Sequence, residues 1–511
     1  MKNFNLKAFL PSKSLLLPLF FLSMAVASCK KDKNPFIDLP VSGPDQLFFG
    51  LSNNSLHKFN AKNAGNAISS VAITGLAANE KMLSIDFRPA TGELYGVSNT
   101  SKLYVIRLNG IARAIGTGFS PAIDGTAVSI DFNPTVDRIR LVTNTGQNLR
   151  IHPETGAVAA TDGIINGIAS PKISGVAYTN SKAGSATTVL FDIDLNSKKL
   201  YKQDPPNEGK LVEVGPLGVE IGSNAAFDIA PDNTKALVAG TTAGASNLYT
   251  INLETGKATL AGKFPTSTAI EGLAIPTDPV AYAVDNANNF LIFNPVNPGT
   301  PVAKAITGLA PSETVLGIDF RPLNGQIYAL GSSSRLYTVN AATGAFTVVG
   351  TGVLSTLLTG SSYGFDFNPT VDRIRVVGND GQNLRLHPET GAVVAIDGTL
   401  KPGTPAISAA AYTNNFFGAT ETILFDIDHV TDKLYKQSPP NDGVLVEVGA
   451  LGINVENTNG FDIGSSSGTA YAILTVAGAN KIYTINLSSG IATPVADFPK
   501  TVTAMTLGLG I

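Results

Sequence analysis

The chain has 511 residues, 43% of them hydrophobic and 15% charged, so it has enough apolar side chains for a packed core, which excludes a globally disordered chain. The 51 Gly and 30 Pro residues indicate many short strands joined by tight turns, and the single Cys excludes an internal disulfide. The formal charge of −3 comes without a basic stripe, which argues against nucleic acid as a partner because phosphate binding needs clustered Lys and Arg.

Residues 1–28 have the pattern of a signal peptide. Lys2, Lys7 and Lys13 precede an apolar run at 15–27 that is too short to span a bilayer comfortably. The run ends in Val-Ala-Ser-Cys at 26–29, which resembles the bacterial lipobox, where the Cys is diacylated and becomes the N-terminus. We therefore expect lipidation at Cys29, anchorage to a membrane, and a place in the cell envelope as an outer-membrane lipoprotein. Loss of residues 1–28, which hold three Lys and no acidic residue, takes the formal charge to −6.

Residues 29–44 are predicted to form a polar tether. The Lys-Lys-Asp-Lys run at 30–33 resembles the export tag of surface lipoproteins in Bacteroidota-type bacteria. A plain solvated linker explains the same residues, so periplasmic and surface-exposed locations both remain open.

The rest of the chain is a duplication with an offset of about 234 residues. Ile-Asp-Phe-Arg-Pro occurs at 85–89 and 318–322, and Asp-Phe-Asn-Pro-Thr-Val-Asp-Arg-Ile-Arg occurs at 131–140 and 366–375. We predict two repeat domains, 45–275 and 276–511.

Within each half, a unit of about 45 residues reads as four strands joined by Gly or Pro turns. Examples of the four strands are 84–87, 93–97, 247–252 and 345–350. Alternating polarity, β-branched and aromatic residues, and Gly at the turns favour strands over helices. Four strands in about 45 residues are typical of a β-propeller blade, so we predict an all-β fold with about ten four-stranded blades.

The order of the strands suggests how a ring closes. The chain enters at 47–50 with a second strand and leaves at 507–511 with what reads as a first strand, equivalent to 272–275. Pairing of such ends leaves no open sheet edge. Two five-bladed propellers are our preferred arrangement. One ten-bladed ring is the alternative, because 275–280 has the spacing of a hairpin.

Three motifs carry a family resemblance: the 131–140 segment, Gly-Gln-Asn-Leu-Arg-Ile-His-Pro-Glu-Thr-Gly at 146–156, and Tyr-Lys-Gln-Asp-Pro-Pro-Asn at 201–207. With their second copies, they resemble the bacterial domain-of-unknown-function family numbered 4394, over nearly all of 45–511. The resemblance implies a fold and no particular activity.

The densest polar cluster of each half is the candidate ligand site. Residues that alternate along a strand share one face of the sheet, and three Arg on one face can hold a carboxylate, sulfate or phosphate. The alternative is a ladder of paired charges buried between neighbouring blades. The candidate residues are Arg138, Arg140, Asn148, Arg150 and His152, with their counterparts Arg373, Arg375, Asn383, Arg385 and His387.

Two sets of acidic residues are further candidates. The first strands carry Asp86, Asp131 and Asp228, repeated as Asp319, Asp366 and Asp462, which would line the propeller axis. They could hold Ca²⁺, and apart from that no cofactor is expected; the alternative is a structural role that recurs in most blades. Phe-Asp-Ile-Asp at 191–194 and 425–428 offers paired carboxylates for a glycosidase, or ordinary turn formers.

The loops 202–207 and 436–441 are either rigid recognition loops or stiff hairpin connections. No catalytic set stands out, so an enzyme is not favoured. The preferred function is a lipid-anchored binding or scaffold protein that presents propeller surfaces to a glycan, peptide or protein. The alternatives are a polysaccharide-acting hydrolase or lyase with carboxylates at a propeller mouth, which would require a cluster present in only one half, and a purely structural spacer.

Overall fold

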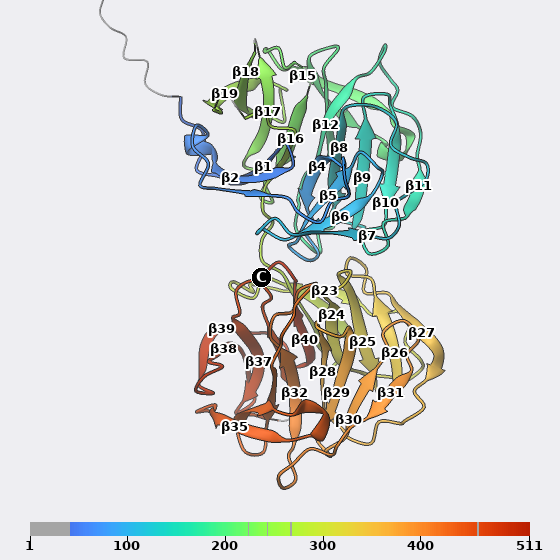
Figure 1. Ribbon diagram of the computed structural model, residues 1–511, viewed down its shortest axis with the longest axis vertical. Helices are drawn as coiled ribbons and strands as arrows, with labels where there is room; N and C mark the ends of the chain where they lie inside the picture. The colour runs from blue at the N-terminus through green and yellow to red at the C-terminus, as the bar shows by residue number, and fades with distance from the viewer. Residues whose placement is uncertain (1–40, 223, 243, 266–267, 457–458) are drawn as a thin grey trace, which may run out of the picture. The chain divides into compact units, whose positions relative to one another are not determined.

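The computed structural model describes residues 41–222, 224–242, 244–265, 268–456 and 459–511. The predicted signal peptide, Cys29 and most of the tether lie outside the described residues. In the described part of the chain, the regular elements are 40 strands and three 3-10 turns (Figure 1), and no helix there is long and apolar enough to cross a membrane. The strands form ten four-stranded antiparallel sheets, which confirms the all-β class and the number of blade-like units. The three turns are η1 (Ala61–Asn63), η2 (Pro206–Glu208) and η3 (Pro440–Asp442).

Five sheets, here called the first ring, use strands between residues 47 and 274. Their strands are β1 (Leu47–Ser52), β2 (Ser55–Asn60), β3 (Ser69–Ala72), β4 (Met82–Phe87), β5 (Leu94–Ser98), β6 (Leu103–Ile106), β7 (Ala112–Ile115), β8 (Val128–Asn133), β9 (Arg138–Thr143), β10 (Asn148–Ile151), β11 (Val158–Thr161), β12 (Ile173–Tyr178), β13 (Leu190–Asp194), β14 (Lys199–Gln203), β15 (Leu211–Pro216), β16 (Ala225–Ile229), β17 (Ala236–Thr242), β18 (Ala245–Ile251), β19 (Ala258–Lys263) and β20 (Gly272–Ala274).

The other five sheets, the second ring, use strands between residues 281 and 507. Their strands are β21 (Ala281–Asp285), β22 (Asn289–Phe293), β23 (Val302–Ala305), β24 (Val315–Arg321), β25 (Gln326–Gly331), β26 (Arg335–Val339), β27 (Phe346–Val353), β28 (Tyr363–Asn368), β29 (Arg373–Gly378), β30 (Asn383–Leu386), β31 (Val393–Ile396), β32 (Ile407–Tyr412), β33 (Leu424–Asp428), β34 (Lys433–Gln437), β35 (Leu445–Ala450), β36 (Asn459–Ile463), β37 (Ala470–Val476), β38 (Ala479–Ile485), β39 (Ala492–Asp497) and β40 (Val502–Leu507).

In each ring, one sheet joins residues from both ends of its half. β20 pairs with β1, and β40 pairs with β21. The first strands β4, β8, β12, β16 and β20 contact one another in this order, and β20 also contacts β4. In the second ring, β40 contacts β24 in the same way. Because β21 pairs with β22 and β40, the 276–280 segment connects the two rings and does not form a hairpin. This order agrees with two five-sheet rings.

Side chains on the first strands tie several neighbouring sheets together. Ser84 Oγ accepts the N–H of Ile130 (3.1 Å), and Asp86 Oδ2 accepts that of Phe132 (2.7 Å). The edge of a sheet that faces a neighbouring first strand has no backbone ladder, so buried N–H groups there need side-chain acceptors. The alternating Ser and Asp residues of these strands provide them.

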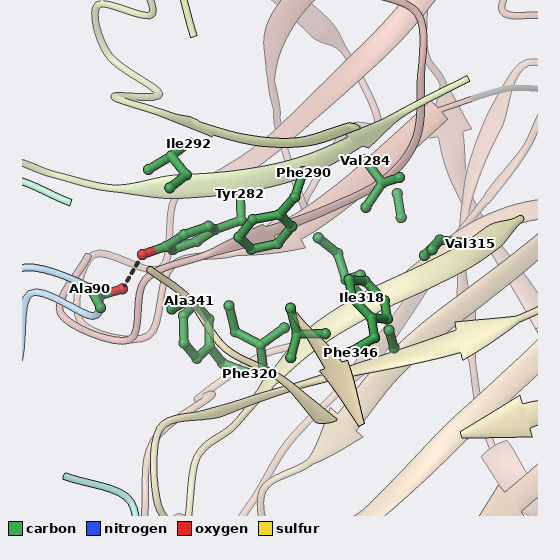
Figure 2. Packing of buried hydrophobic residues seen from close by; sticks show 14 of the residues in the cluster. Ala90, Tyr282, Val284, Phe290, Ile292, Val315, Ile318, Phe320, Ala341 and Phe346 are labelled. Carbon is green, nitrogen blue, oxygen red and sulfur yellow. Dashed lines mark hydrogen bonds between the residues drawn. The ribbon is translucent and has the colours of Figure 1, made fainter. Parts of the chain in front are cut away.

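Apolar layers fill the spaces between neighbouring sheets. In the second ring, the β21–β23 sheet packs against the β24–β27 sheet through Tyr282, Phe290, Ile318 and Phe320 (Figure 2). Each ring has five such layers, one for every pair of neighbouring sheets. Each sheet is therefore covered on both faces.

The final strand lies earlier in the chain than the sequence predicts. β40 ends at Leu507, and the Gly508 and Gly510 that follow it lie beside other backbone segments: the N–H of Gly510 donates to Thr91 O (2.8 Å). Leu507 is equivalent to Ile275, because their N–H groups donate to Asp462 and Asp228 respectively. The two Leu-Gly pairs at 507–510 mimic strand alternation, which explains the error.

Candidate functional site

Arg140 on β9 lies at the centre of a polar network between the β8–β11 and β12–β15 sheets. Its guanidinium donates to Asn148 Oδ1 (2.8 Å), Asp162 Oδ2 (2.5 Å), Asn207 Oδ1 (2.7 Å) and, through Nε, Tyr178 OH (3.3 Å). The Arg140 side chain is only 2% exposed. Since most of its N–H groups are used inside the protein, these contacts favour a buried ladder over a ligand site.

The second ring repeats the network. Arg375 donates to Asn383 Oδ1, Asp397 Oδ2 and Asn441 Oδ1 at distances within 0.1 Å of those in the first ring, and it is equally buried. The same geometry in both copies indicates a requirement of the repeat rather than a feature of one site.

Arg150 and Arg385, which contact the same carboxylates as Arg140 and Arg375, are each about one third exposed. Each is already bound: Arg150 donates from Nε and Nη2 to both oxygens of Asp162 (2.8 and 2.9 Å), and Arg385 holds Asp397 in the same way. A carboxylate of the protein therefore occupies the bidentate fork that an anionic ligand would need.

The other four predicted residues lie beside turns, at the ends of strands, and outside the Arg140 and Arg375 networks. Arg138 and Arg373 donate to the backbone carbonyls of Asp137 (2.7 Å) and Asp372 (2.8 Å). The Nδ1 atom of His152 lies 2.7 Å from Glu154 Oε2, and that of His387 accepts a backbone N–H (3.2 Å). The predicted set thus divides into two separate groups in each ring.

The loops at 202–207 and 436–441 point part of their polar groups inward. Pro206 O accepts from Asn148 Nδ2 (3.1 Å) and Gln203 Nε2 (2.5 Å), while Asn207 accepts from Arg140. Pro440 and Asn441 do the same in the second ring. These contacts fit stiff connections between strands.

The Phe-Asp-Ile-Asp segments do not present an exposed carboxylate pair. Asp194 Oδ2 accepts from Ser197 N (2.7 Å), and Asp428 accepts from Thr431 N (3.0 Å), as turn-forming residues do. Asp192 and Asp426 are fully buried, and their carboxylates have no hydrogen-bond partner in the described part of the chain. Burial raises the pKa of Asp426 to about 8, against the attraction of Arg375.

Three carboxylates meet on the axis of each ring, as the sequence predicts. One oxygen from each of Asp86, Asp131 and Asp228 lies within 4.8 Å of the others, and all three residues are buried. Most of these oxygens already accept backbone N–H groups, for instance Asp131 Oδ1 from Tyr178 (3.0 Å) and Asp228 Oδ2 from Ile275 (2.6 Å). The structural role is therefore visible in the contacts, and the Ca²⁺ hypothesis stays a prediction.

The axial carboxyl groups resist ionisation. Burial raises the pKa of Asp86 and Asp131 well above the usual value, and neighbouring carboxylates raise it further. The pKa of Asp228 is about 7, because burial outweighs the two N–H groups that it accepts. In the second ring, Thr506 Oγ1 lies 2.9 Å from Asp319 Oδ1 and 3.1 Å from Asp462 Oδ2. A hydroxyl has one proton to donate, so a protonated carboxyl group on one of the two Asp residues would let both contacts be full hydrogen bonds.

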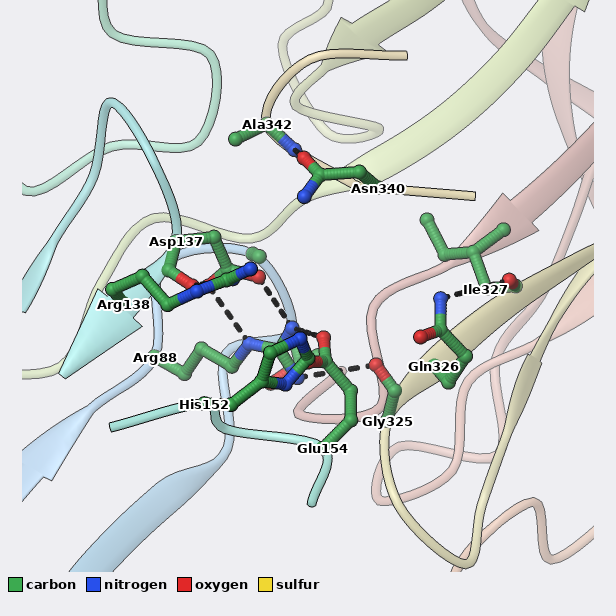
Figure 3. Close-up of polar contacts among 12 residues, drawn as sticks. Arg88, Asp137, Arg138, His152, Glu154, Gly325, Gln326, Ile327, Asn340 and Ala342 are labelled. Carbon is green, nitrogen blue, oxygen red and sulfur yellow. Dashed lines mark hydrogen bonds and ion pairs between the residues drawn. The ribbon is translucent and has the colours of Figure 1, made fainter. Parts of the chain in front are cut away.

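Sequence reasoning missed a buried cluster around Arg88 (Figure 3). Arg88 forms ion pairs with Asp137 and Glu154, and its Nη1 donates to Gly325 O (3.1 Å) in the second ring. Its side chain is 0% exposed, and the Arg88 guanidinium holds the pKa of Glu154 at about 2, against burial. The three residues belong to three of the repeated motifs, so a signal was present, but nothing in the sequence shows that the motifs meet.

The equivalent cluster of the second ring is more open. Arg321 donates to Asp372 Oδ1 (2.8 Å) and Glu389 Oε1 (3.2 Å), and the Glu389 side chain is 66% exposed. The Arg-Asp-Glu cluster therefore belongs to the repeat, while its burial depends on which ring carries it.

A crevice of about 500 Å³ lies where the two rings meet. It is lined by 92–94 and 105–109 of the first ring and by 414, 416–417, 465–468 and 509–510 of the second. The Arg107 guanidinium sits 3.6 Å from the ring centre of Phe416, and Arg113 sits 5.2 Å from that of the adjacent Phe417.

Glu93 is the one carboxylate among the described residues that line this crevice, and its Oε2 has no hydrogen-bond partner. Burial raises the pKa of Glu93 to about 7, against the attraction of Arg88. The crevice residues differ between the two copies: Glu93, Arg107 and Phe416 correspond to Gln326, Asn340 and Lys182. These differences were the signal that could have found the crevice.

Comparison with known families gives one result. The model of a family described as a domain of unknown function (DUF4394) matches residues 55–274 and again residues 289–508. A search of curated proteins gives no match.

Among solved structures, the chain is similar to PorZ, described as an essential bacterial surface component of the type-IX secretion system of Porphyromonas gingivalis. The identity is 13% and the TM-score is 0.26, over 90% of this chain and 59% of the PorZ chain. The chain thus spans well under two thirds of the length of PorZ, and a likeness this weak carries no argument about function.

Proposed function

Because the chain belongs to the DUF4394 family, as two tandem copies, and because those copies differ where they meet, we propose that it is a cell-envelope protein that binds a ligand at the crevice between its rings. In this proposal, a lipid on Cys29 holds it to the membrane, with the rings as a scaffold for the binding surface. The family carries no activity that could be transferred, so the proposal rests on the geometry.

The observation that carries the proposal is the contrast between the repeated polar clusters and the crevice. The Arg140 and Arg375 networks and the axial carboxylates make their hydrogen bonds mostly within the protein. The crevice, in contrast, has the volume of a small-ligand site. It combines an aromatic ring with an arginine and a carboxylate oxygen that have, among the described residues, no ion pair and no hydrogen-bond partner respectively.

The chemistry of the crevice suits a polar ligand with both donors and acceptors. Glu93 offers an acceptor when it is ionised and a donor when it is protonated, and a pKa of about 7 makes both states accessible. The Phe416 ring offers apolar contact, and Asn109 and Asn414 offer amides. A glycan of the envelope has this mixture of hydroxyl groups and apolar ring faces, and we put it ahead of a peptide or a protein.

A hydrolase is not favoured, because glycoside hydrolysis needs two carboxylates and the described lining of the crevice has one. A purely structural spacer is the second candidate. Its support is that the repeated clusters are directed into the fold, with Arg140 and Arg375 each 2% exposed.

The test is a thermal-shift screen of the mature protein, without its lipid, against envelope glycans, small anions, and Ca²⁺ with and without chelator. A ligand that binds the folded state raises Tm by mass action. We expect a glycan-dependent shift that is lost in Arg107→Ala and reduced in Glu93→Gln, a change that copies the residue at position 326. A rise in Tm with Ca²⁺ alone would indicate binding at the axial carboxylates instead of the crevice. No rise in Tm with any compound would favour the structural spacer.

A further inference from the structure

The two rings contact each other through the same end of the repeat. The first-ring turn at 88–92 reaches the second ring at two points: Tyr282 OH donates to Ala90 O (2.9 Å; Figure 2) and Gly510 N donates to Thr91 O (2.8 Å). The equivalent turn of the second ring, 321–325, reaches the first ring, where Gly325 O accepts from Arg88 (Figure 3).

Two further elements meet in both directions. The loop at 413–423 brings Phe416 to Arg107, which follows β6. The equivalent loop of the first ring, 179–189, lines a small cavity with Ala341 and Ala342, which follow β26, the counterpart of β6. The same three elements of each copy therefore form the contact, as in a face-to-face dimer of one repeat with another.

At these equivalent positions, the residues of a first ring complement those of a second ring. They do not complement those of another first ring, and the same holds for two second rings. Arg107 and Arg113 of the first ring face Phe416 and Phe417 of the second, each arginine over a ring. Two first rings in this arrangement would place Arg107 against Lys182, a pair of like charges. Two second rings would place Phe416 against Asn340 and lose the cation–π contact.

We propose that this end of the repeat is a docking surface for a second copy of the repeat, and that the Arg107–Phe416 and Arg113–Phe417 contacts direct the first ring to the second. The docking does not depend on the covalent connection between the rings. That connection, 276–279, is exposed at Asp278, and the Lys182–Asp278 ion pair (3.5 Å) is about half exposed on both sides, so solvent screens it.

The experiment uses the whole mature chain with a protease site inserted between Asp278 and Pro279, both of which are exposed. After cleavage, we expect the two halves to co-elute at micromolar concentration as a 1:1 complex with the mass of the intact chain. Separation of the wild-type halves, each still folded by circular dichroism, would overturn the docking surface.

A swap variant tests the direction of pairing. Phe416→Lys with Phe417→Ala gives the second ring the residues of the first at these positions, and we expect roughly a tenfold or larger rise in the Kd between the cleaved halves. The matched control, Ile396→Lys with Val394→Ala, makes the same kind of change on the outer strand β31, where both residues are exposed. Its Kd should equal that of the wild type.

A swap variant that binds as tightly as the control would overturn the role of the two phenylalanines, and uncleaved samples of both variants show whether each still folds. The result does not depend on a ligand: the rings can dock whether or not the crevice binds a glycan, so the two proposals can fail separately.

Discussion

At the scale of single residues, the buried arginines of the repeat act as connectors between sheets. Arg140 links β10, through Asn148, to the turn at Asp162 and the loop at Asn207. Arg88 contacts Asp137 and Glu154, which lie in two hairpin turns of the next sheet. An arginine suits this role because its five donors are fixed in one plane, so one side chain can satisfy acceptors on several segments.

Replacing Arg140 should therefore cost stability. Arg140→Ala leaves Asn207, Asn148 and part of Asp162 without a donor in a buried place, and we expect a loss of about 3 kcal/mol in the free energy of unfolding. Arg150→Ala is the control, because Arg150 binds the same Asp162 from a position one third exposed and should cost about 1 kcal/mol or less. Urea unfolding measures both, and equal losses would contradict the connector role.

The axial carboxylates should make stability depend on pH. A carboxyl group whose pKa is raised in the folded state takes up a proton on folding, so its contribution is complete below the unfolded pKa of about 3.9 and is lost as the pH rises towards the folded pKa. For Asp228, with a folded pKa of about 7, this loss falls between about pH 4 and pH 7.

The variant Asp131→Asn removes one ionisable group from this cluster while its amide oxygen can still accept from Tyr178. We expect the difference in Tm, variant minus wild type, to be larger at pH 8 than at pH 5 by roughly 3 °C or more. For a unit the size of one ring, about 1 kcal/mol shifts Tm by roughly 2–4 °C. Groups outside the axial cluster titrate equally in both proteins and cancel. A difference that does not change with pH would show that the cluster is not protonated.

The lipid anchor is also a single-residue prediction. Cys29→Ser should move the protein from the membrane fraction to the soluble envelope fraction and abolish incorporation of labelled palmitate. The protein should remain folded, because position 29 precedes the first strand at Leu47. Retention of the variant in the membrane would contradict the lipobox interpretation.

At the scale of elements, each ring depends on one strand pairing that is distant in sequence. β40 pairs with β21 across more than 200 residues, and it also brings Leu507 N to Asp462. Closure of this kind removes the open edge between the last sheet and the first.

A proline in β40 should open the second ring. Ala504→Pro removes a buried backbone donor that faces Val284 of β21, on the same side of the strand as the N–H of Gly508, which donates to Val280 O. We expect a loss of about 3 kcal/mol or more, with faster hydrogen exchange in β21 and β36. Val495→Pro, in the bulged outer strand β39 beside the native Pro494, is the control and should change little. If exchange in β21 stays as slow as in the wild type, closure does not depend on β40.

The sequence predicted elements well where local chemistry decides them. The 131–140 hairpin follows from Asn133, whose side chain accepts from Thr135 N, and from Asp137, which adopts a left-handed φ of 51° that Asp tolerates. The last strand was misplaced because 507–511 alternates like a strand, whereas β40 ends at Leu507, whose N–H donates to Asp462.

The site was harder to predict than the fold, since its residues meet only in three dimensions. Arg88 and Glu154 are 66 residues apart, and Arg88 and Gly325 are 237 apart. Dense polar motifs drew attention to Arg140, which the fold itself uses. The crevice residues carry no motif, and their signal is that Glu93, Arg107 and Phe416 are not repeated in the other half.

At the scale of the whole molecule, the duplication lets one set of residues build each ring and another set form the crevice between the rings. Residues that are the same in both halves build each ring, such as the Arg140 and Arg375 networks. Some residues that differ, among them Glu93, Arg107 and Phe416, lie at the contact between the rings and line the crevice. A single-copy ring would have the first set without the second.

The most direct test of this division compares two variants in one equilibrium binding experiment, with the wild type, on envelope glycan fragments that shift Tm. Arg107→Ala should weaken glycan binding at least roughly tenfold while each ring unfolds as in the wild type, since Arg107 lies at the crevice, has no ion pair among the described residues and contacts Phe416 of the other ring. Arg140→Ala with Arg375→Ala should lower stability and leave the affinity of the remaining folded protein unchanged. The reverse pattern, with binding lost in the double variant and kept in Arg107→Ala, would contradict the account and return the site to the repeated arginines.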